Sequence, residues 1–315
     1  MIEYISQILL LFGINVILAV SLNVINGYCG LFSLGHAGFF AVGAYSAAAF
    51  TKFMIPGLAE SSPFLASFLA CLVAMTLAGT VGLIVGIPCL RLTGDYLAIA
   101  TIGFSEIIRI VFLNMDAVGA ARGLPGIARL TNLPFTIGAA VFTVLIINNL
   151  IRSSFGRCII AIREDEIAAR SMGVNVRFYK TFSFVVASLF AGLAGGLFAH
   201  FQQFLHPSNF DFMVSVSPLL MIVIGGIGTQ RGSILGAFIV TLLPEMLRFV
   251  GRGFQFLIPS WEGAPEFFTQ IRMLIFGFLL IAMMLWKPEG LMGILNFRKK
   301  KDSLKSNGGL LGGSK

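Results

Sequence analysis

Glu106 and Arg109 are the most chemically unusual side chains in this sequence, because they stand inside an apolar run. Their i, i+3 spacing places both on one face of a helix, where a carboxylate and a guanidinium can pair. An ionisable residue at membrane depth costs free energy and generally faces a cavity or a partner. The pair therefore either lines a polar path or gate between two membrane subunits, or satisfies itself as a structural ion pair. The spacing alone leaves both interpretations open.

The sequence shows no set of side chains typical of an enzyme or a metal site. Its three histidines, His36, His200 and His206, include no i, i+4 pair, and no acid or thiol stands at ligand spacing from them. Its four cysteines include no CxxC pair, so we expect them to be small buried hydrophobic residues. No nucleophile, histidine and acid combination is evident. We predict no catalytic residue, no metal and no cofactor bound by this chain.

A glycine-rich stretch, GGIGTQRG at residues 225–232, invites comparison with a phosphate-binding loop. A P-loop ends in Gly-Lys-Ser/Thr, which is missing here, and Arg231 interrupts the GxGxxG spacing. No Walker A motif occurs elsewhere in the sequence, so this chain is not expected to hydrolyse ATP by itself. We predict instead a break in a membrane helix, or a site of close packing. The glycines concerned are Gly225, Gly226, Gly228 and Gly232.

The longest polar interval between the apolar runs is residues 152–180, which holds six basic residues and three consecutive acids. A short helix is predicted at 164–173, because helix formers precede Gly173 and the charges suit the helix dipole. If exposed, Ala168 and Ala169 would fit a groove in a partner. The alternative is a solvated loop whose positive charge only fixes its side of the membrane.

These residues are held by apolar runs long enough to cross a membrane. The chain is 57% hydrophobic and only 11% charged, whereas soluble domains carry about 25% charged residues. A spanning helix needs about 20 apolar residues. We predict an all-α, polytopic transmembrane bundle of about eight or nine spanning or broken helices. The runs are residues 8–25, 27–50, 64–90, 96–113, 135–151, 181–203, 217–250 and 267–286, of which the second and seventh are glycine-interrupted.

The net charge of +8 is concentrated in residues 152–180 and in the basic tail after residue 297. Basic residues mark the cytoplasmic side of a membrane protein, so we expect both segments there, and we do not expect nucleic-acid binding. Nine crossings would put the two segments on one side. We divide the chain into a transmembrane domain at 1–297 and a Gly/Ser-rich tail at 298–315 that we expect to be disordered. No cleaved signal peptide is predicted.

Four stretches of the sequence resemble, in order and spacing, the LivM-type permease subunits of branched-chain amino-acid ABC transporters. They are GYCGLFSLGHAGFFAVGAY at 27–45, LRLTGDYLAIATIGFSEIIRIVFLN at 90–114, GRCIIAIREDEIAARSMGVNV at 156–176 and IGGIGTQRGSILGAF at 224–238. Within the third, EIAARSMGV resembles the cytoplasmic coupling helix of ABC importer permeases, whose pattern is EAA…G. Ile167 stands where that pattern has Glu. The resemblance covers about residues 10–295.

This resemblance implies an inner-membrane importer subunit for leucine, isoleucine and valine. Its implied partners are a homologous permease, two cytoplasmic ATPases that use ATP, and an extracytoplasmic substrate-binding protein. The residues expected to couple to the ATPases are Arg163, Glu164, Asp165, Glu166, Ala168, Ala169 and Gly173. The residues expected to line the translocation pathway are Asn23, Ser33, His36, Thr101, Ser105, Glu106 and Arg109.

Three alternatives remain open from the sequence. Permeases for urea and short-chain amides look similar to the LivM type, so the substrate is not fixed. A secondary transporter without an ATPase would more often carry unpaired membrane acids, whereas Glu106 has Arg109 nearby. A membrane scaffold without transport activity is the third.

Overall fold

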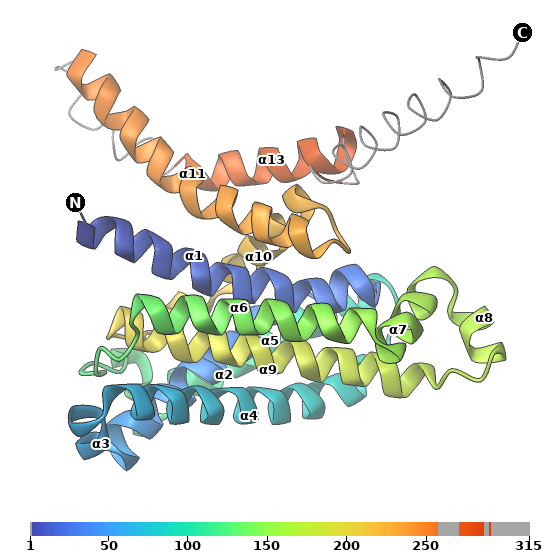
Figure 1. Ribbon diagram of the computed structural model, residues 1–315, viewed down its shortest axis with the longest axis horizontal. Helices are drawn as coiled ribbons and strands as arrows, with labels where there is room; N and C mark the ends of the chain where they lie inside the picture. The colour runs from blue at the N-terminus through green and yellow to red at the C-terminus, as the bar shows by residue number, and fades with distance from the viewer. Residues whose placement is uncertain (1, 258–270, 287–289, 291–315) are drawn as a thin grey trace, which may run out of the picture.

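The fold is known from a computed structural model that describes residues 2–257, 271–286 and 290 (Figure 1). Within these residues the chain is helical, and the one β-type pairing is an isolated bridge between Leu124 and Leu205. The predicted all-α polytopic bundle is therefore confirmed. The predicted tail at 298–315 lies outside the described residues.

The long helices follow the apolar runs of the sequence. They are α1 (Ile2–Asn23), α2 (His36–Ala49), α4 (Pro63–Cys89), α5 (Asp95–Asn114), α6 (Leu133–Arg152), α9 (Val176–Gln202), α10 (Phe212–Gly225), α11 (Gln230–Leu257) and α13 (Arg272–Trp286). Shorter ones are η1 (Val24–Tyr28), η2 (Phe50–Met54), α3 (Pro56–Ser61), η3 (Asp116–Val118), η4 (Ala120–Arg122), α7 (Ser154–Glu164), α8 (Glu166–Ser171) and η5 (Pro207–Phe210). Seven helical segments of the described residues are long and apolar enough to span a membrane. The shorter α2 and α13 have 14 and 15 residues.

Both glycine-rich stretches interrupt membrane-level helices. After α1 the chain widens into the π-helix η1, and residues 29–35 are non-helical until α2 begins at His36. The second interruption separates α10 from α11, where Gly226 and Gly228 adopt φ values of 117° and 76°. Such positive φ values suit glycine, because a Cβ would clash with the backbone. The second break thus falls within residues 225–232, where Gly226 and Gly228 are non-helical while Gly225 ends α10 and Gly232 is in α11.

The helix α9 is at the centre of the bundle and packs against α1, α2 and α4. Small residues allow this close approach. A Cβ on Gly43 of α2 would lie 2.2 Å from the carbonyl oxygen of Gly192, and one on Gly195 would lie 2.1 Å from that of Phe40. Helices in lipid associate largely through such close packing, because lipid tails are as apolar as the helix surfaces.

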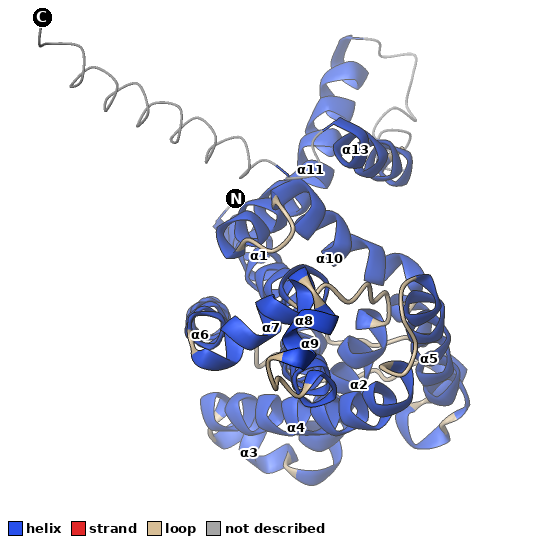
Figure 2. Ribbon diagram, turned by 90° about the vertical axis from the view of Figure 1, so that its right-hand side faces the viewer, coloured by secondary structure: helices blue, strands red, loops and turns tan. Residues whose placement is uncertain are grey.

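The polar central segment lies at one end of this bundle. The helices α7 and α8 project there, beyond the ends of the long helices, and α13 runs toward the same end (Figure 1). Viewed from that end, α5 and α6 lie on opposite sides of α9 (Figure 2). The bundle therefore carries α8 at one end, and its two sides are formed by α5 and by α6.

Candidate functional site

The helix α8 is built by local capping of a short stretch. The Asp165 carboxylate accepts hydrogen bonds from the backbone N–H groups of Ile167 (2.8 Å) and Ala168 (3.0 Å). At the other end Gly173 adopts φ 85°, and its N–H donates to the carbonyl of Arg170. An N-terminal acid and a left-handed glycine are the usual signals for starting and ending a helix. The predicted helix at 164–173 thus exists but is shorter, because Glu164 closes α7.

The exposed face of α8 differs from the one the sequence predicted. Ala168 is exposed as expected, but Ala169 is 5% exposed and packs with Ile162 and Val176. The expectation that both alanines face a partner was therefore wrong for Ala169, since the helix turns that position toward α7 and α9. The outward positions are Ile167 and Met172, which are 80% and 84% exposed. Both are large apolar side chains left open to solvent, Ile167 in α8 and Met172 at its C-cap.

Charged contacts fix α8 to the start of α9. Glu166 lies 2.6 Å from the Lys180 ammonium and 3.1 Å from the Arg170 guanidinium. The Lys180 side chain is 10% exposed, so this contact is shielded from solvent on the lysine side. The Glu166–Lys180 contact therefore joins α8 to α9, the central helix of the bundle.

Arg163, the last basic residue of α7, connects the projecting segment with both helix breaks. Its guanidinium donates to the carbonyl of Gly27 (3.0 Å) and also pairs with Glu164. Its stem passes so close to Gly30 that a Cβ there would lie 2.7 Å from the arginine Cγ. At Gly228 a Cβ would lie 2.8 Å from the same guanidinium. One side chain thus touches the chain after α1 and the turn between α10 and α11.

Asn23 completes this junction from the end of α1. Its side chain accepts a hydrogen bond from the N–H of Gly228 (2.9 Å) and donates to the carbonyl of Thr229 (3.2 Å). Asn23 is fully buried, so both contacts are protected from water. The sequence assigned Asn23, Arg163 and Gly228 to three different roles, whereas the structure brings them together.

Four other polar residues expected along a pathway are buried inside the subunit. The Thr101 hydroxyl accepts from the N–H of Leu34, and a Cβ on Gly38 would meet Ser105. His36 Nε2 lies 2.9 Å from the Ser21 hydroxyl. Among the described residues, His36 Nδ1 and the Ser33 hydroxyl have no hydrogen-bond partner. These side chains lie where the first break packs against α1 and α5. In the described part of the chain, no group of acids, histidines and cysteines is arranged to bind a metal.

Glu106 and Arg109 are placed differently, at the partly exposed margin of the outer face of α5. The Arg109 Nε–H donates to both carboxylate oxygens of Glu106 at 2.9 Å, so the two residues form the predicted pair. Their side chains are 43% and 24% exposed. The same face carries Ile107, which is 55% exposed, and Gly103, which has no neighbour within 4 Å of an added Cβ. The pair is therefore available to whatever lies beside α5.

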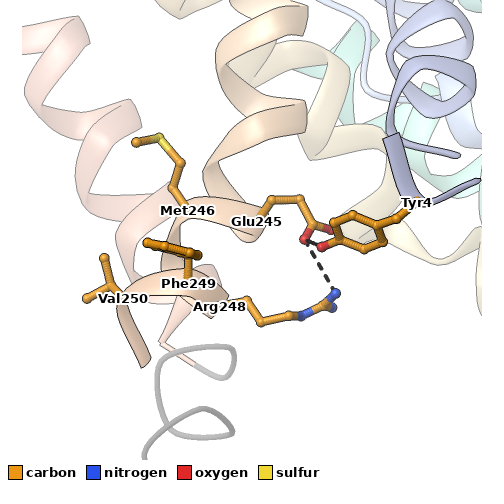
Figure 3. A pocket seen from close by; sticks show the side chains of 6 residues that line it. All are labelled: Tyr4, Glu245, Met246, Arg248, Phe249 and Val250. Carbon is orange, nitrogen blue, oxygen red and sulfur yellow. Dashed lines mark hydrogen bonds and ion pairs between the residues drawn. The ribbon is translucent and has the colours of Figure 1, made fainter. Parts of the chain in front are cut away.

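A second pair with the same spacing was missed from the sequence. Glu245 and Arg248 of α11 lie 3.4 Å apart, and the Glu245 carboxylate also accepts a hydrogen bond from the Tyr4 hydroxyl of α1 (Figure 3). They line a pocket of about 330 Å³ at the end of the bundle opposite α8. The signal was available, because EMLR at 245–248 repeats the spacing of EIIR at 106–109.

Comparison with known proteins now identifies the class of the chain. Residues 4–284 match the family model described as the branched-chain amino acid transport system / permease component. The chain belongs to this family. The matched residues include α8, both helix breaks and the α5 pair. Together with the LivM relatives described next, the match confirms the predicted resemblance to LivM-type permeases.

Individual members of the permease family support the assignment. The high-affinity branched-chain amino acid permease protein LivM of Escherichia coli K12 is 35% identical over 89% of this chain and 68% of its own length. A probable LivM of Methanocaldococcus jannaschii is 26% identical over 92% and 93% of the two chains. A probable LivH of the same organism is 23% identical over 68% and 65%. No solved structure matches the chain.

Proposed function

We propose that this chain is the permease subunit of an ATP-driven importer, assembled with a homologous permease and two cytoplasmic ABC ATPases. An extracytoplasmic binding protein delivers the substrate, and ATP is used by the partner subunits. The observation that carries the proposal is the exposure of two large apolar side chains, Ile167 and Met172, on the α8 segment that projects beyond the bundle (Figure 1). A soluble partner that covers these side chains would gain the free energy of burying them.

The ATPases dock on α8 through these two side chains. A helix presenting adjacent apolar residues fits a hydrophobic groove in a partner. Asp165 and Gly173 define the ends of the helix, and Ala169 with the Glu166–Lys180 pair fixes it to α9. The docking residues of the chain are thus held rigidly, so that movement of the ATPases moves α8 and does not merely deform it.

Arg163 and Asn23 carry the movement inward. Arg163 joins α7 to the carbonyl of Gly27, and Asn23 joins the end of α1 to the Gly228 turn. Helix breaks are places where backbone angles can change with little loss of hydrogen bonding. ATP binding favours one membrane conformation only if the ATPases contact the two conformations differently. In this proposal, the contacts of Arg163 and Asn23 carry the movement of the ATPases to the membrane helices.

The outward face of α5 meets the homologous permease and, with it, encloses the substrate pathway. A half-exposed ion pair is costly beside lipid tails, so Glu106 and Arg109 require a polar or water-filled neighbour. The buried Ser33, His36, Thr101 and Ser105 act one layer behind this face, where the first helix break packs against α1 and α5.

The end that carries α8 faces the cytoplasm of a cell with this subunit in its inner membrane. The basic residues of 152–180 support that orientation by the positive-inside rule. The helix α13 runs toward the same end, which favours a cytoplasmic C-terminus.

The substrates we propose are the branched-chain amino acids leucine, isoleucine and valine, because the LivM relatives are named as branched-chain amino acid permeases. The test is uptake of labelled leucine, urea and a short-chain amide by the assembled complex. Leucine uptake that needs ATP supports the proposal. Uptake of urea or amide alone would show that the proposed substrate is wrong. Uptake without the ATPases would show that the proposed ATP-driven mechanism is wrong.

Docking is tested by the double variant I167D/M172D. Two carboxylates at the tip of α8 cannot enter an apolar groove, so we expect loss of ATPase co-purification and at least about a tenfold loss of uptake. The matched control is Leu92→Asp, an exposed apolar residue in the turn between α4 and α5. If I167D/M172D keeps its ATPases and its uptake, α8 is not the dock. Ala169→Arg is a poorer test, because Ala169 is buried in the subunit itself.

A further inference from the structure

A groove opens at the α8 end of the bundle, between the last turns of α6 and the first turns of α11. Both helices pack against α1, and the space between them forms a cavity of about 500 Å³. Tyr28 and Thr229, from the two helix breaks, also line it. The groove therefore lies beside the Arg163 junction but is not part of the contacts described there.

Four of the residues that line the groove, two from each helix, are polar or positively charged. Arg152, the last residue of α6, and Arg231, in the first turn of α11, line it together with Asn148 and Gln230. No carboxylate is among the lining residues. In the described part of the chain, neither arginine forms an ion pair. Two guanidiniums and two amides with no acid beside them suit a phosphate group, which guanidiniums bind through paired hydrogen bonds.

The same two helices also bring apolar side chains to the groove. Val144, Ile151 and Ile234 line the groove. Further along α6, Val141 and Leu145 are 51% and 55% exposed. A ligand with a phosphate at the helix ends and hydrocarbon along α6 would contact both the polar and the apolar side chains. Because Arg152 and Arg231 stand at the ends of membrane-spanning helices, they lie at the depth of lipid headgroups.

The position of the groove favours lipid over a second subunit. The half-exposed ion pair that needs a polar neighbour is on α5, and α5 and α6 lie on opposite sides of α9 (Figure 2). A partner beside α5 leaves the flank of α6 to the bilayer.

We propose that this groove binds the headgroup of an anionic phospholipid, with Arg152 and Arg231 holding its phosphate and the acyl chains lying along α6. The side chain of Gln230 already donates to the carbonyl of Val144 across the groove. A bound lipid adds a second bridge between α6 and α11, next to the turn that carries Gly228. This site is distinct from the proposed ATPase dock, and it rests on the proposed function only where the partner permease is placed beside α5. Basic pockets between membrane helices are a known means of recognising anionic headgroups.

The experiment is native mass spectrometry of the purified full-length chain in detergent, with phosphatidylglycerol or phosphatidylcholine added at equal concentrations. We expect one phosphatidylglycerol to be retained preferentially, and R152Q/R231Q to reduce that retention at least about fivefold, since two charge-assisted contacts are lost. The matched control is R91Q/R177Q, which removes two exposed arginines that do not line the groove. It should retain lipid as the unchanged chain does.

Three outcomes would overturn the proposal. They are equal retention by R152Q/R231Q and the unchanged chain, equal retention of the two lipids, and displacement by millimolar inorganic phosphate, which would indicate a site for free phosphate. If the double variant does not fold, R152K/R231K decides the question, because it keeps the charge and must keep the preference for phosphatidylglycerol. None of these measurements uses transport, so a negative result leaves the proposed function standing.

Discussion

The α7–α8 segment and the outward face of α5 both carry charges that the sequence picks out, but they use them in different ways. In the segment, charges reach other elements: Arg163 contacts Gly27 beyond α1, and Glu166 contacts Lys180 in α9. On α5, Glu106 and Arg109 contact each other within one helix. The first arrangement joins elements that are far apart in the sequence, whereas the second neutralises charge within one helix.

The two arrangements predict different effects when their charges are removed. A charge that joins two elements should affect coupling between ATPase and pathway when removed, while leaving each element folded. A charge pair within one helix should affect transport only through its contacts with whatever lies beside that helix. If α5 faced lipid alone, replacing both charges would remove the free-energy cost of holding them beside lipid tails and would stabilise the protein. If it faces a pathway, the same change should impair transport.

The largest effect is expected for Arg163→Ala. The hydrogen bond to the Gly27 carbonyl is charge-assisted, and such bonds contribute about 1.5–3 kcal/mol. If the junction transmits movement, uptake should fall about tenfold or more while the ATPases still co-purify. The measurement is uptake and ATP hydrolysis by the same preparation, where hydrolysis should continue without matching uptake.

The control for Arg163→Ala is Arg157→Ala, which removes an exposed arginine from the same helix. It should leave the ratio of uptake to hydrolysis unchanged. An unchanged ratio in Arg163→Ala as well would mean that the junction does not transmit movement, whatever the role of α8.

Glu106→Gln is expected to have the next largest effect. The change leaves the Arg109 guanidinium without its carboxylate on a half-exposed face, and we expect uptake to fall about fivefold, or about 1 kcal/mol in the transport step. The measurement is uptake by Glu106→Gln, by R109Q and by E106Q/R109Q. If the double variant recovers full uptake, the pair is only structural, and α5 need not face a polar pathway.

The sequence predicted the membrane helices and both breaks because their signals are local. Apolar runs and glycine clusters are properties of a few neighbouring residues, and α4, α5 and α6 begin and end close to the predicted limits. The direction in which Ala169 faces was not predictable in this way. It depends on Ile162 and Val176, which come from two other helices.

The junction around Arg163 was likewise invisible, because it joins residues that are far apart in the chain. Asn23 and Gly228 meet only after α1 and α10 have packed. Nothing in their local sequence indicates this contact. The pair of Glu245 and Arg248 is the opposite case, since its spacing was visible and only its contact with Tyr4 required the fold.

The smallest effect is expected for Asp165→Ala, which tests whether α8 must be rigid. Loss of an N-cap costs about 1 kcal/mol of helix stability, and here it removes the two backbone hydrogen bonds to Ile167 and Ala168. The contacts of Ala169 and Glu166 remain, so α8 should loosen without detaching. We expect faster amide hydrogen exchange at 166–171 and about a twofold loss of uptake, with ATPase co-purification retained. Asp165→Asn keeps a capping oxygen and should restore slow exchange. Should exchange accelerate in Asp165→Ala while uptake stays unchanged, a rigid α8 is not required, and the Arg163 junction alone would have to account for coupling.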